Sequence, residues 1–372
     1  MTNTTKIIIG IIILIIVIIG IWYGVSKKPA EEEPIKIGVI VVLSGDAAIY
    51  GEDAKKGLDL ALEEINKEGG VLGKKIELIY EDSRLDPKEA VTAMNKFINI
   101  DRLPIVIIAE GSGPTSAVAP LADSNKTLLM VSIASTPTIK DAGDYVFRTM
   151  LSDDYQAFKM IKVSKDLGFR SAAILYVNDT YGIGIKDVFS EGFEEFGNVI
   201  IKESFEGSAT DFRAQLTKIK SSKPDVIIIV ARKEFPLILK QAKELGLDSQ
   251  IIASETLKDE SLIKESGDAA ESVLIPFVAE PLGYSEYKTK YKEKYEEEPV
   301  LYGNFSYDAL RVLAIAIQNA GLIDSEKVKN ALYDVVYEGA SGLVKFDSNG
   351  EVIEKPFNMY KVVDGKIEEF NR

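Results

Sequence analysis

Two short polar motifs follow strand-like apolar runs and end on different chemical groups. Ala134-Ser135-Thr136 follows one run, and Ala253-Ser254-Glu255 follows another. A hydroxyl with neighbouring backbone N–H groups can hold an anion, whereas a carboxylate accepts hydrogen bonds from a cation. The chain contains neither histidine nor cysteine, which excludes histidine-based catalysis, cysteine nucleophiles, zinc sites and disulfides. The pattern therefore favours binding over catalysis.

The elements that position these motifs occur twice. In each copy a strand-like run is followed by a Tyr-Gly pair at the start of a helix-like segment: 37–43 before Tyr50, and 172–177 before Tyr181. A second strand and a second helix then lead to the motif. Alternating strands and helices predict a parallel sheet with helices on both faces, and ligands bind beyond the carboxyl ends of such strands. We therefore predict two similar lobes facing each other across a cleft.

The composition limits the partners. The 372 residues suffice for two domains with separate cores, and 58 acidic against 44 basic residues leave a net charge of −14. Because the chain has no basic patch, nucleic acid is not an expected partner. A metal site made of carboxylates alone, or a Ser-Lys pair, stays open without positive support. We expect no metal, no cofactor and no enzymatic activity.

The N-terminal segment predicts a membrane anchor. Residues 7–25 are apolar apart from small and aromatic residues, a length that fits a membrane span, with Trp22 and Tyr23 suited to the interface. A signal peptide that is removed is the alternative. Lysines flank both ends of the segment, so charge does not decide its orientation. We place the soluble body outside the cell because the capture of a ligand requires it there.

The rest of the chain is organised as a tether and a body. Residues 26–34 are charged and bounded by prolines, which predicts an extended linker. Residues 284–298 form a charged, tyrosine-rich helical segment that we expect to lie on the first lobe, with docking of a partner as the alternative. The last thirty residues predict a small antiparallel meander with Asx-Gly turns. The predicted boundaries are 35–148 with 277–341 for lobe 1, and 149–276 with 342–372 for lobe 2.

Several longer stretches resemble the type I periplasmic-binding proteins, and most closely the leucine/isoleucine/valine-binding branch that feeds ABC importers. The stretches are Ile37-Gly-Val-Ile-Val-Val-Leu-Ser-Gly45 with Tyr50-Gly51, Ile65-Asn-Lys-Glu-Gly-Gly-Val-Leu-Gly-Lys-Lys75, Asp86-Pro-Lys-Glu-Ala90, Asp211-Phe212 and Pro224-Asp225. The resemblance covers the chain from about Ile35 onward. It implies an α/β fold of two doubly wound parallel-sheet lobes, joined by three crossovers. The disulfide that the family has in its first lobe is missing here.

The resemblance also implies which residues contact the ligand. In that family the cleft holds the α-carboxylate and the α-ammonium of an amino acid. The matching positions are Tyr50, Ser112, Thr115, Ser116, Ala134, Ser135, Thr136, Tyr181 and Glu255. The family serine of the first loop corresponds to Thr115 or Ser116. Hydroxyl and backbone groups would hold the carboxylate, and Glu255 would hold the ammonium. For each position the alternative is structural: a helix cap, a packed turn or a carboxylate at a helix start.

Two further residues are expected at the mouth of the cleft. Glu110 and Arg232 follow paired strands of the two lobes, so we predict that they face each other. An interlobe salt bridge that forms on closure is the first hypothesis. Recognition of an acidic ligand side chain by Arg232 is the second, and plain exposure to solvent is the third.

These observations predict an extracytoplasmic binding protein that captures a small amino acid, with an aliphatic one favoured, for an ABC permease. A receptor ectodomain is the first alternative, although few residues precede the predicted span. A Rossmann-type enzyme is less favoured because no G-x-G-x-x-G follows a strand. Amide, urea-type, acidic and aromatic ligands stay open.

Overall fold

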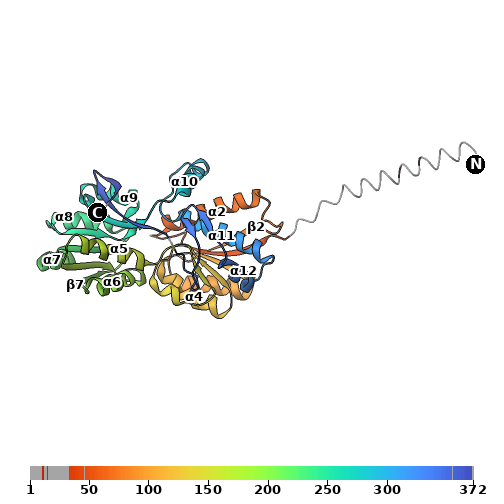
Figure 1. Cartoon of the computed structure of the whole chain (residues 1–372), viewed down its shortest axis with the longest axis horizontal. Helices are drawn as coiled ribbons and strands as arrows, with labels where there is room; N and C mark the ends of the chain where they lie inside the picture. Colours follow the sequence, from red (N-terminus) through yellow and green to blue (C-terminus); the bar gives the residue numbers. More distant parts are fainter. Residues whose placement is uncertain (1–10, 12–14, 16–32, 46, 354, 371–372) are drawn as a thin grey trace, which may run out of the picture.

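The computed structural model describes residues 11, 15, 33–45, 47–353 and 355–370 (Figure 1). Two α/β lobes lie side by side, and the C-terminal end of the chain is in the second lobe, on the left of the view. The predicted span at 7–25 lies outside the described residues apart from 11 and 15, and the predicted linker at 26–34 apart from 33 and 34. Among the described residues, none of the helices is both long enough and apolar enough to cross a membrane.

The first lobe is built on a five-stranded parallel sheet of order β2-β1-β3-β4-β5. Apart from the edge strand β2, its strands are mostly apolar and buried, as expected for a sheet covered on both faces. The strands are β1 (Ile35–Val41), β2 (Ile76–Asp82), β3 (Ile105–Ala109), β4 (Leu128–Val131) and β5 (Val146–Arg148). The helices are α2 (Ala48–Lys67), α3 (Pro87–Lys96), η1 (Phe97–Asp101), α4 (Ser112–Ser124), η2 (Pro137–Asp141), α11 (Gly303–Ala320) and α12 (Ser325–Leu332).

The second lobe is built on a seven-stranded sheet of order β14-β13-β10-β9-β8-β6-β7, in which β13 and β14 are antiparallel to their neighbours. The strands are β6 (Ser171–Val177), β7 (Asn198–Phe205), β8 (Val226–Val230), β9 (Gln250–Ala253), β10 (Leu274–Val278), β13 (Phe357–Val363) and β14 (Lys366–Glu369). The helices are α5 (Asp153–Asp166), α6 (Thr180–Phe193), α7 (Arg213–Ser222), α8 (Phe235–Glu244), η3 (Glu255–Lys258), α9 (Glu260–Ser266) and η4 (Gly267–Ala270).

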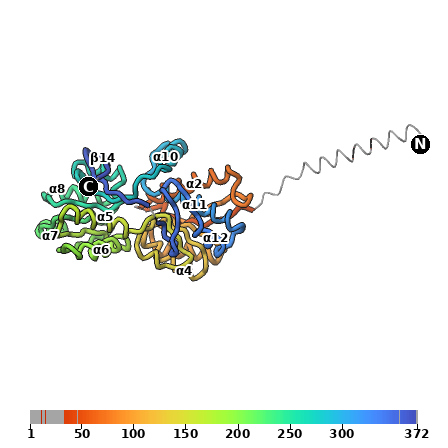
Figure 2. Tube along the Cα trace, viewed as in Figure 1, coloured from red at the N-terminus to blue at the C-terminus, as the bar shows by residue number. Residues whose placement is uncertain are grey.

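The chain passes between the lobes after β5, after β10 and again before β13, which matches the expected crossovers (Figure 2). The last passage differs from the predicted boundary. Val344, Phe346 and Val352 belong to the core of the first lobe, so residues 342–352 pack there and not on lobe 2. The predicted single meander is also wrong, because β11 (Tyr337–Gly339) and β12 (Gly342–Val344) form a separate hairpin. The β13–β14 hairpin does turn at Asp364-Gly365, where both φ angles are positive.

A buried lysine ties the first and last crossovers together. Lys355 Nζ donates to the Thr149 carbonyl (3.2 Å) and to Ser341 Oγ (2.8 Å). The Ser341 hydroxyl and backbone N–H in turn donate to Asp308 of α11. Burial lowers the pKa of Lys355 to about 8 and raises the pKa of Asp308. The first and last crossovers therefore meet in a cluster of hydrogen bonds that also includes Asp308 of the first lobe.

Helix α10 (Leu282–Tyr295) lies on the first lobe, as the tyrosine-rich segment predicts (Figure 1). The ring of Tyr287 packs edge-on against Tyr307 of α11, with 5.4 Å between centroids. Lys294 pairs with Glu63 of α2 at 2.7 Å. Helix α10 follows β10 of the second lobe in the chain. Aromatic packing against α11 and ion pairs with α2 nevertheless hold it on the first lobe.

Helices α2 and α11 approach each other closely at two glycines. A Cβ on Gly57 would lie 2.0 Å from the Gly303 carbonyl oxygen, which is backbone and cannot turn away. We expect Gly57→Ala to lower the free energy of unfolding by about 2 kcal/mol, since overpacking outweighs the gain in helix propensity. Urea denaturation measures this change. Gly192→Ala on α6 is the control, because its Cβ would mainly meet the movable side chain of Ile161. Equal stability of the two variants would contradict the prediction.

Candidate ligand-binding site

A pocket lies between the two lobes, at the carboxyl ends of their parallel strands. Its cavity volume is about 50 Å³, so the pocket is narrow. Its walls come from segments that follow β1, β3 and β4 in one lobe and β6, β8 and β9 in the other, together with the starts of α2 and α11. Its lining residues are Val42, Ala47, Tyr50, Leu85, Gly111, Ser112, Ile133, Ala134, Ser135, Tyr181, Arg232, Glu255, Thr256 and Tyr302. The position is the one that the topology of two doubly wound sheets dictates.

Three tyrosines form much of this wall, and each lies at the start of a helix. Tyr50 and Tyr302 pack edge-on with 5.5 Å between ring centroids, and Tyr181 lies on the opposite lobe. Tyr302 was not predicted, although the Tyr-Gly pair of positions 50 and 181 recurs at 302. The glycine is needed at Gly51, where a Cβ would lie 1.7 Å from the Val42 carbonyl oxygen. The repeated dipeptide is therefore the signal that could have identified Tyr302.

The Tyr302 loop is held by a carboxylate that sequence reasoning missed. Asp53 on α2 is 1% exposed and accepts hydrogen bonds from four successive backbone N–H groups, those of residues 300–303. The donor–acceptor distances are 2.7–3.1 Å. Asp53 therefore accepts hydrogen bonds from the first N–H groups of α11, as a helix-capping side chain does. The same bonds hold Tyr302 in the pocket wall.

Glu255 begins the short helix η3 after β9 and is 1% exposed. The Tyr181 hydroxyl donates to Glu255 Oε2 at 2.8 Å, and the Glu255 backbone N–H donates to Gln156 Oε1 at 3.3 Å. Burial raises the pKa of Glu255, because loss of water disfavours its charged form. A cation that entered the pocket would meet an acceptor without a permanent positive partner of its own.

The facing wall carries hydrogen-bond donors. Ser112 is the first residue of α4, a thirteen-residue helix whose N-cap, Gly111, makes no side-chain cap bond. The first N–H groups of a helix have no partner within it, so they favour an anion. Ala134 and Ser135 line the pocket from the segment after β4. The pocket therefore presents donors on lobe 1 and a carboxylate on lobe 2.

Three of the predicted contact residues do not line the pocket. The hydroxyls of Thr115 and Ser116 are buried without a hydrogen-bond partner, in the second turn of α4. The Thr136 carbonyl accepts from Arg148 at 2.9 Å, and its hydroxyl lies 3.4 Å from that of Thr138. The prediction places all three near the right strand ends, and the Thr136 hydroxyl lies toward α6 of the second lobe, 3.3 Å from where a Cβ on Gly184 would be.

Glu110 and Arg232 do not form the predicted interlobe salt bridge. Glu110 is fully buried and accepts from the Ser83 hydroxyl within its own lobe, and burial raises its pKa to about 8. Arg232 pairs with Asp179 of its own lobe at 2.8 Å and stacks over the Tyr181 ring at 4.7 Å. Because Glu110 bonds to Ser83 and Arg232 pairs with Asp179, neither side chain is paired with the other lobe. Arg232 does line the pocket, whereas Glu110 does not.

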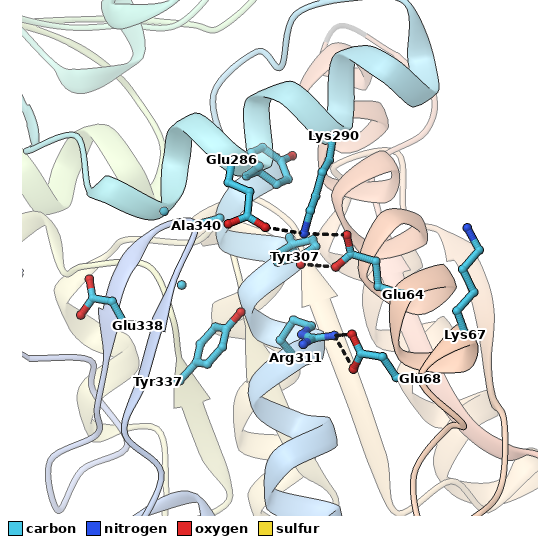
Figure 3. Close-up of a pocket in the computed structure, with 13 residues that line it drawn as sticks. Glu64, Lys67, Glu68, Glu286, Lys290, Tyr307, Arg311, Tyr337, Glu338 and Ala340 are labelled. Atoms are coloured by element: carbon cyan, nitrogen blue, oxygen red, sulfur yellow. Dashed lines mark hydrogen bonds and ion pairs between the residues drawn. The ribbon is translucent and has the colours of Figure 1, made fainter.

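A second hollow, of about 470 Å³, lies on the outside of the first lobe between α2, α10 and α11 (Figure 3). Lys290 points between Glu64 and Glu286, with 3.0 and 2.9 Å to their carboxylates, and Arg311 pairs with Glu68 at 3.1 Å. Its cations are thus neutralised by local carboxylates. Within the described residues, no cluster of three or more acidic side chains is placed to hold a metal ion.

Comparison with known proteins gives one family. The model of the periplasmic binding protein family matches residues 34–366. The leucine-, isoleucine-, valine-, threonine- and alanine-binding protein of Pseudomonas aeruginosa is 29% identical over 346 residues, covering 91% of this chain and 92% of that protein. The Leu/Ile/Val-binding protein BraC3 of Rhizobium johnstonii is 30% identical, covering 92% and 96%.

Solved structures share the fold. The leucine-binding protein LivK of Thermotoga maritima has a TM-score of 0.83 and 29% identity, covering 91% of this chain and 98% of that one. The substrate-binding protein LivJ of Streptococcus pneumoniae, in complex with isoleucine, has a TM-score of 0.81 and 27% identity, covering 90% and 98%. A solute-binding protein of R. palustris in complex with benzoate has a TM-score of 0.82 but only 18% identity, covering 91% and 95%, so it shows the fold alone.

Proposed function

Because this chain belongs to the periplasmic binding protein family, we propose that it is an extracytoplasmic solute-binding protein that captures a small α-amino acid between its lobes. The observation that carries this proposal is the arrangement of Glu255 opposite the start of α4 in one buried pocket. An α-amino acid has the two complementary charges. The named ligands of the relatives, leucine, isoleucine and valine, belong to the same class.

The lining of the pocket offers a chemical partner to each part of such a ligand. The ammonium would bind Glu255, and the carboxylate would bind N–H groups at Gly111 and Ser112. Hydrogen bonds to charged groups contribute roughly 1.5–3 kcal/mol each, before the cost of ordering the partners is subtracted. Val42, Ile133 and the tyrosine rings offer apolar surface to an aliphatic side chain. An aliphatic amino acid therefore agrees best with the lining.

The partners follow from this role. We propose that the protein delivers its ligand to the permease of an ABC transporter, as its resemblance to the leucine/isoleucine/valine-binding branch implies. The apolar segment 7–25 would anchor the body to the outer side of the cell membrane or act as its signal. We further propose the contact residues of the prediction that line the pocket, Tyr50, Ser112, Ala134, Ser135, Tyr181 and Glu255, as ligand contacts.

A thermal-shift screen tests the proposal. We expect leucine, isoleucine or valine to raise the melting temperature, because a ligand that binds only the folded state stabilises it. Isoamylamine and 4-methylpentanoate, which each carry one of the two charges of leucine, should have little effect. Stabilisation by benzoate and by no amino acid would contradict the proposal and point to aromatic carboxylates.

The role of Arg232 can be tested in the same protein. We expect Arg232→Ala to weaken leucine binding by about fivefold, since the ring of Tyr181 loses a stacked cation worth ~1 kcal/mol. Calorimetric titration with leucine and with glutamate measures the change. A wild-type protein that prefers glutamate, and loses this preference in the variant, would instead assign Arg232 to an acidic ligand side chain.

A further inference from the structure

A second buried carboxylate is connected to the proposed ammonium site through Gln156. Asp153 starts α5 after the first crossover and is 1% exposed. Gln156 links the Asp153 carboxylate to the main chain of Glu255, because its Nε2 donates to Asp153 Oδ1 at 2.5 Å and its Oε1 accepts from the Glu255 backbone N–H at 3.3 Å. The other oxygen of Asp153, Oδ2, is buried and has no hydrogen-bond partner. Asp153 and Glu255 therefore form a bridged pair of buried acids at the boundary of the lobes.

The cations around this pair have other partners. Arg148 of β5 pairs with Glu351 and donates to the Thr136 carbonyl. Arg232, after β8, pairs with Asp179. Three tyrosines also face the pair: Tyr50 of α2, Tyr181 of α6 and Tyr302 at the start of α11. Arg148 still lowers the pKa of Asp153, and Arg232 lowers that of Glu255, but each arginine forms its ion pair with another carboxylate.

We propose that the Asp153–Glu255 pair holds one proton when the pocket is empty, and that the ammonium of the ligand replaces this proton. The proposal rests on the amino-acid-binding function proposed above. One O–H bond breaks as the ammonium binds, and the proton leaves for solvent. The ammonium takes over the positive charge of that proton, so the acid pair and the ammonium together keep the same charge. Asp153 acts through Glu255 as a positioning residue, because it does not line the pocket itself.

The electrostatics of the pair agree with this exchange. Burial is the largest cause that raises the pKa of Asp153, and the charge of Glu255 raises it further. Burial also raises the pKa of Glu255. Two carboxylates that share a buried site cannot both ionise at the ordinary pKa of about 4. When the ammonium of the ligand binds, its positive charge lowers the pKa of both acids. The pair therefore releases the proton that it shared.

The exchange fixes the sign of the pH dependence. Because binding releases a proton, the association constant rises with pH, by at most tenfold per pH unit for one proton. The association constant begins to rise at a pH above the ordinary carboxylate pKa. It stops rising once the pH exceeds the raised pKa of the empty pair. The ammonium of the ligand stays protonated throughout this range, so it does not contribute to the slope.

Calorimetric titration of the full chain tests the proposal, with leucine, isoleucine or valine as the ligand, whichever stabilises most. Between pH 5 and 8, each titration is run in two buffers of different ionisation enthalpy. We expect the heats to differ by an amount that corresponds to release of up to one proton, and the affinity to rise with pH. Measurable binding with equal heats in both buffers at every pH would overturn the proposal. Absence of binding by all three amino acids would instead contradict the proposed function.

Matched variants assign the proton to the pair. Asp153→Asn keeps the shape of the side chain, and we expect its proton release and its pH slope to fall close to zero. Asp154→Asn is the control, because Asp154 lies in the same helical turn but pairs with Lys140 and Ser152. It should keep the wild-type slope. Unchanged proton release in Asp153→Asn would overturn the assignment, and the wild-type buffer comparison remains decisive if that variant does not fold.

Discussion

Replacement of Glu255 by glutamine is expected to weaken the binding of aliphatic amino acids by about ten- to a hundredfold. A hydrogen bond between an ammonium and a carboxylate contributes roughly 1.5–3 kcal/mol, and a neutral amide cannot replace its charge. Glutamine has almost the same shape and can still accept from the Tyr181 hydroxyl, so the fold should be preserved. Removal of a buried carboxylate should leave the stability of the empty protein unchanged or slightly higher.

Calorimetric titration with leucine and thermal denaturation without ligand measure the two effects separately. Glu265→Gln is the matched control, since this glutamate is exposed on α9 of the same lobe. It should bind like the wild type. If Glu255→Gln kept full affinity for every amino acid, the ammonium would lie elsewhere, and the proposed polarity of the pocket would be wrong.

The architecture could be predicted because it depends on a repeated pattern. Two runs of alternating strand and helix, each with a Tyr-Gly pair, determine two parallel sheets and therefore the place of the pocket. The same pattern brings Tyr50, Tyr181 and Glu255 together from distant parts of the chain. The return of residues 342–352 to the first lobe has no such periodic signal, and its placement depends on apolar side chains such as Phe346 that fill the core there.

The contact residues were harder to predict because a strand end determines position but not direction. Thr136 follows β4 as expected, yet its hydroxyl lies 3.4 Å from that of Thr138, and the pocket lining passes from Ser135 to the other lobe without it. Glu110 follows β3 as expected, yet Ser83 lies within hydrogen-bonding distance in the same lobe. Asp153 comes from a crossover helix, so only the folded chain brings it to Glu255 through Gln156. Short-range hydrogen bonding, which periodicity does not encode, decides each of these cases.

The largest effect on stability is expected at Asp53, which holds the loop before α11. Its Oδ2 accepts from the N–H groups of Leu301, Tyr302 and Gly303, and its Oδ1 accepts from that of Val300. In Asp53→Ala these donors would stay in a region that excludes water, and a buried donor without a partner costs about 1–3 kcal/mol. Because relaxation of the loop would satisfy some of them, we expect a loss of ~3–5 kcal/mol in the free energy of unfolding.

The same substitution links stability to binding. Release of the loop frees Tyr302, which packs on Tyr50 in the pocket wall, so leucine affinity should fall together with stability. Asp53→Asn keeps one acceptor oxygen and should lose about half as much stability, and Glu52→Ala, at an exposed neighbouring position, should lose almost none. Urea denaturation and calorimetric titration on all three variants test the link. A destabilised Asp53→Ala that still binds leucine like the wild type would show that Tyr302 contributes nothing to the ligand, whereas an unchanged stability would refute the role of Asp53 itself.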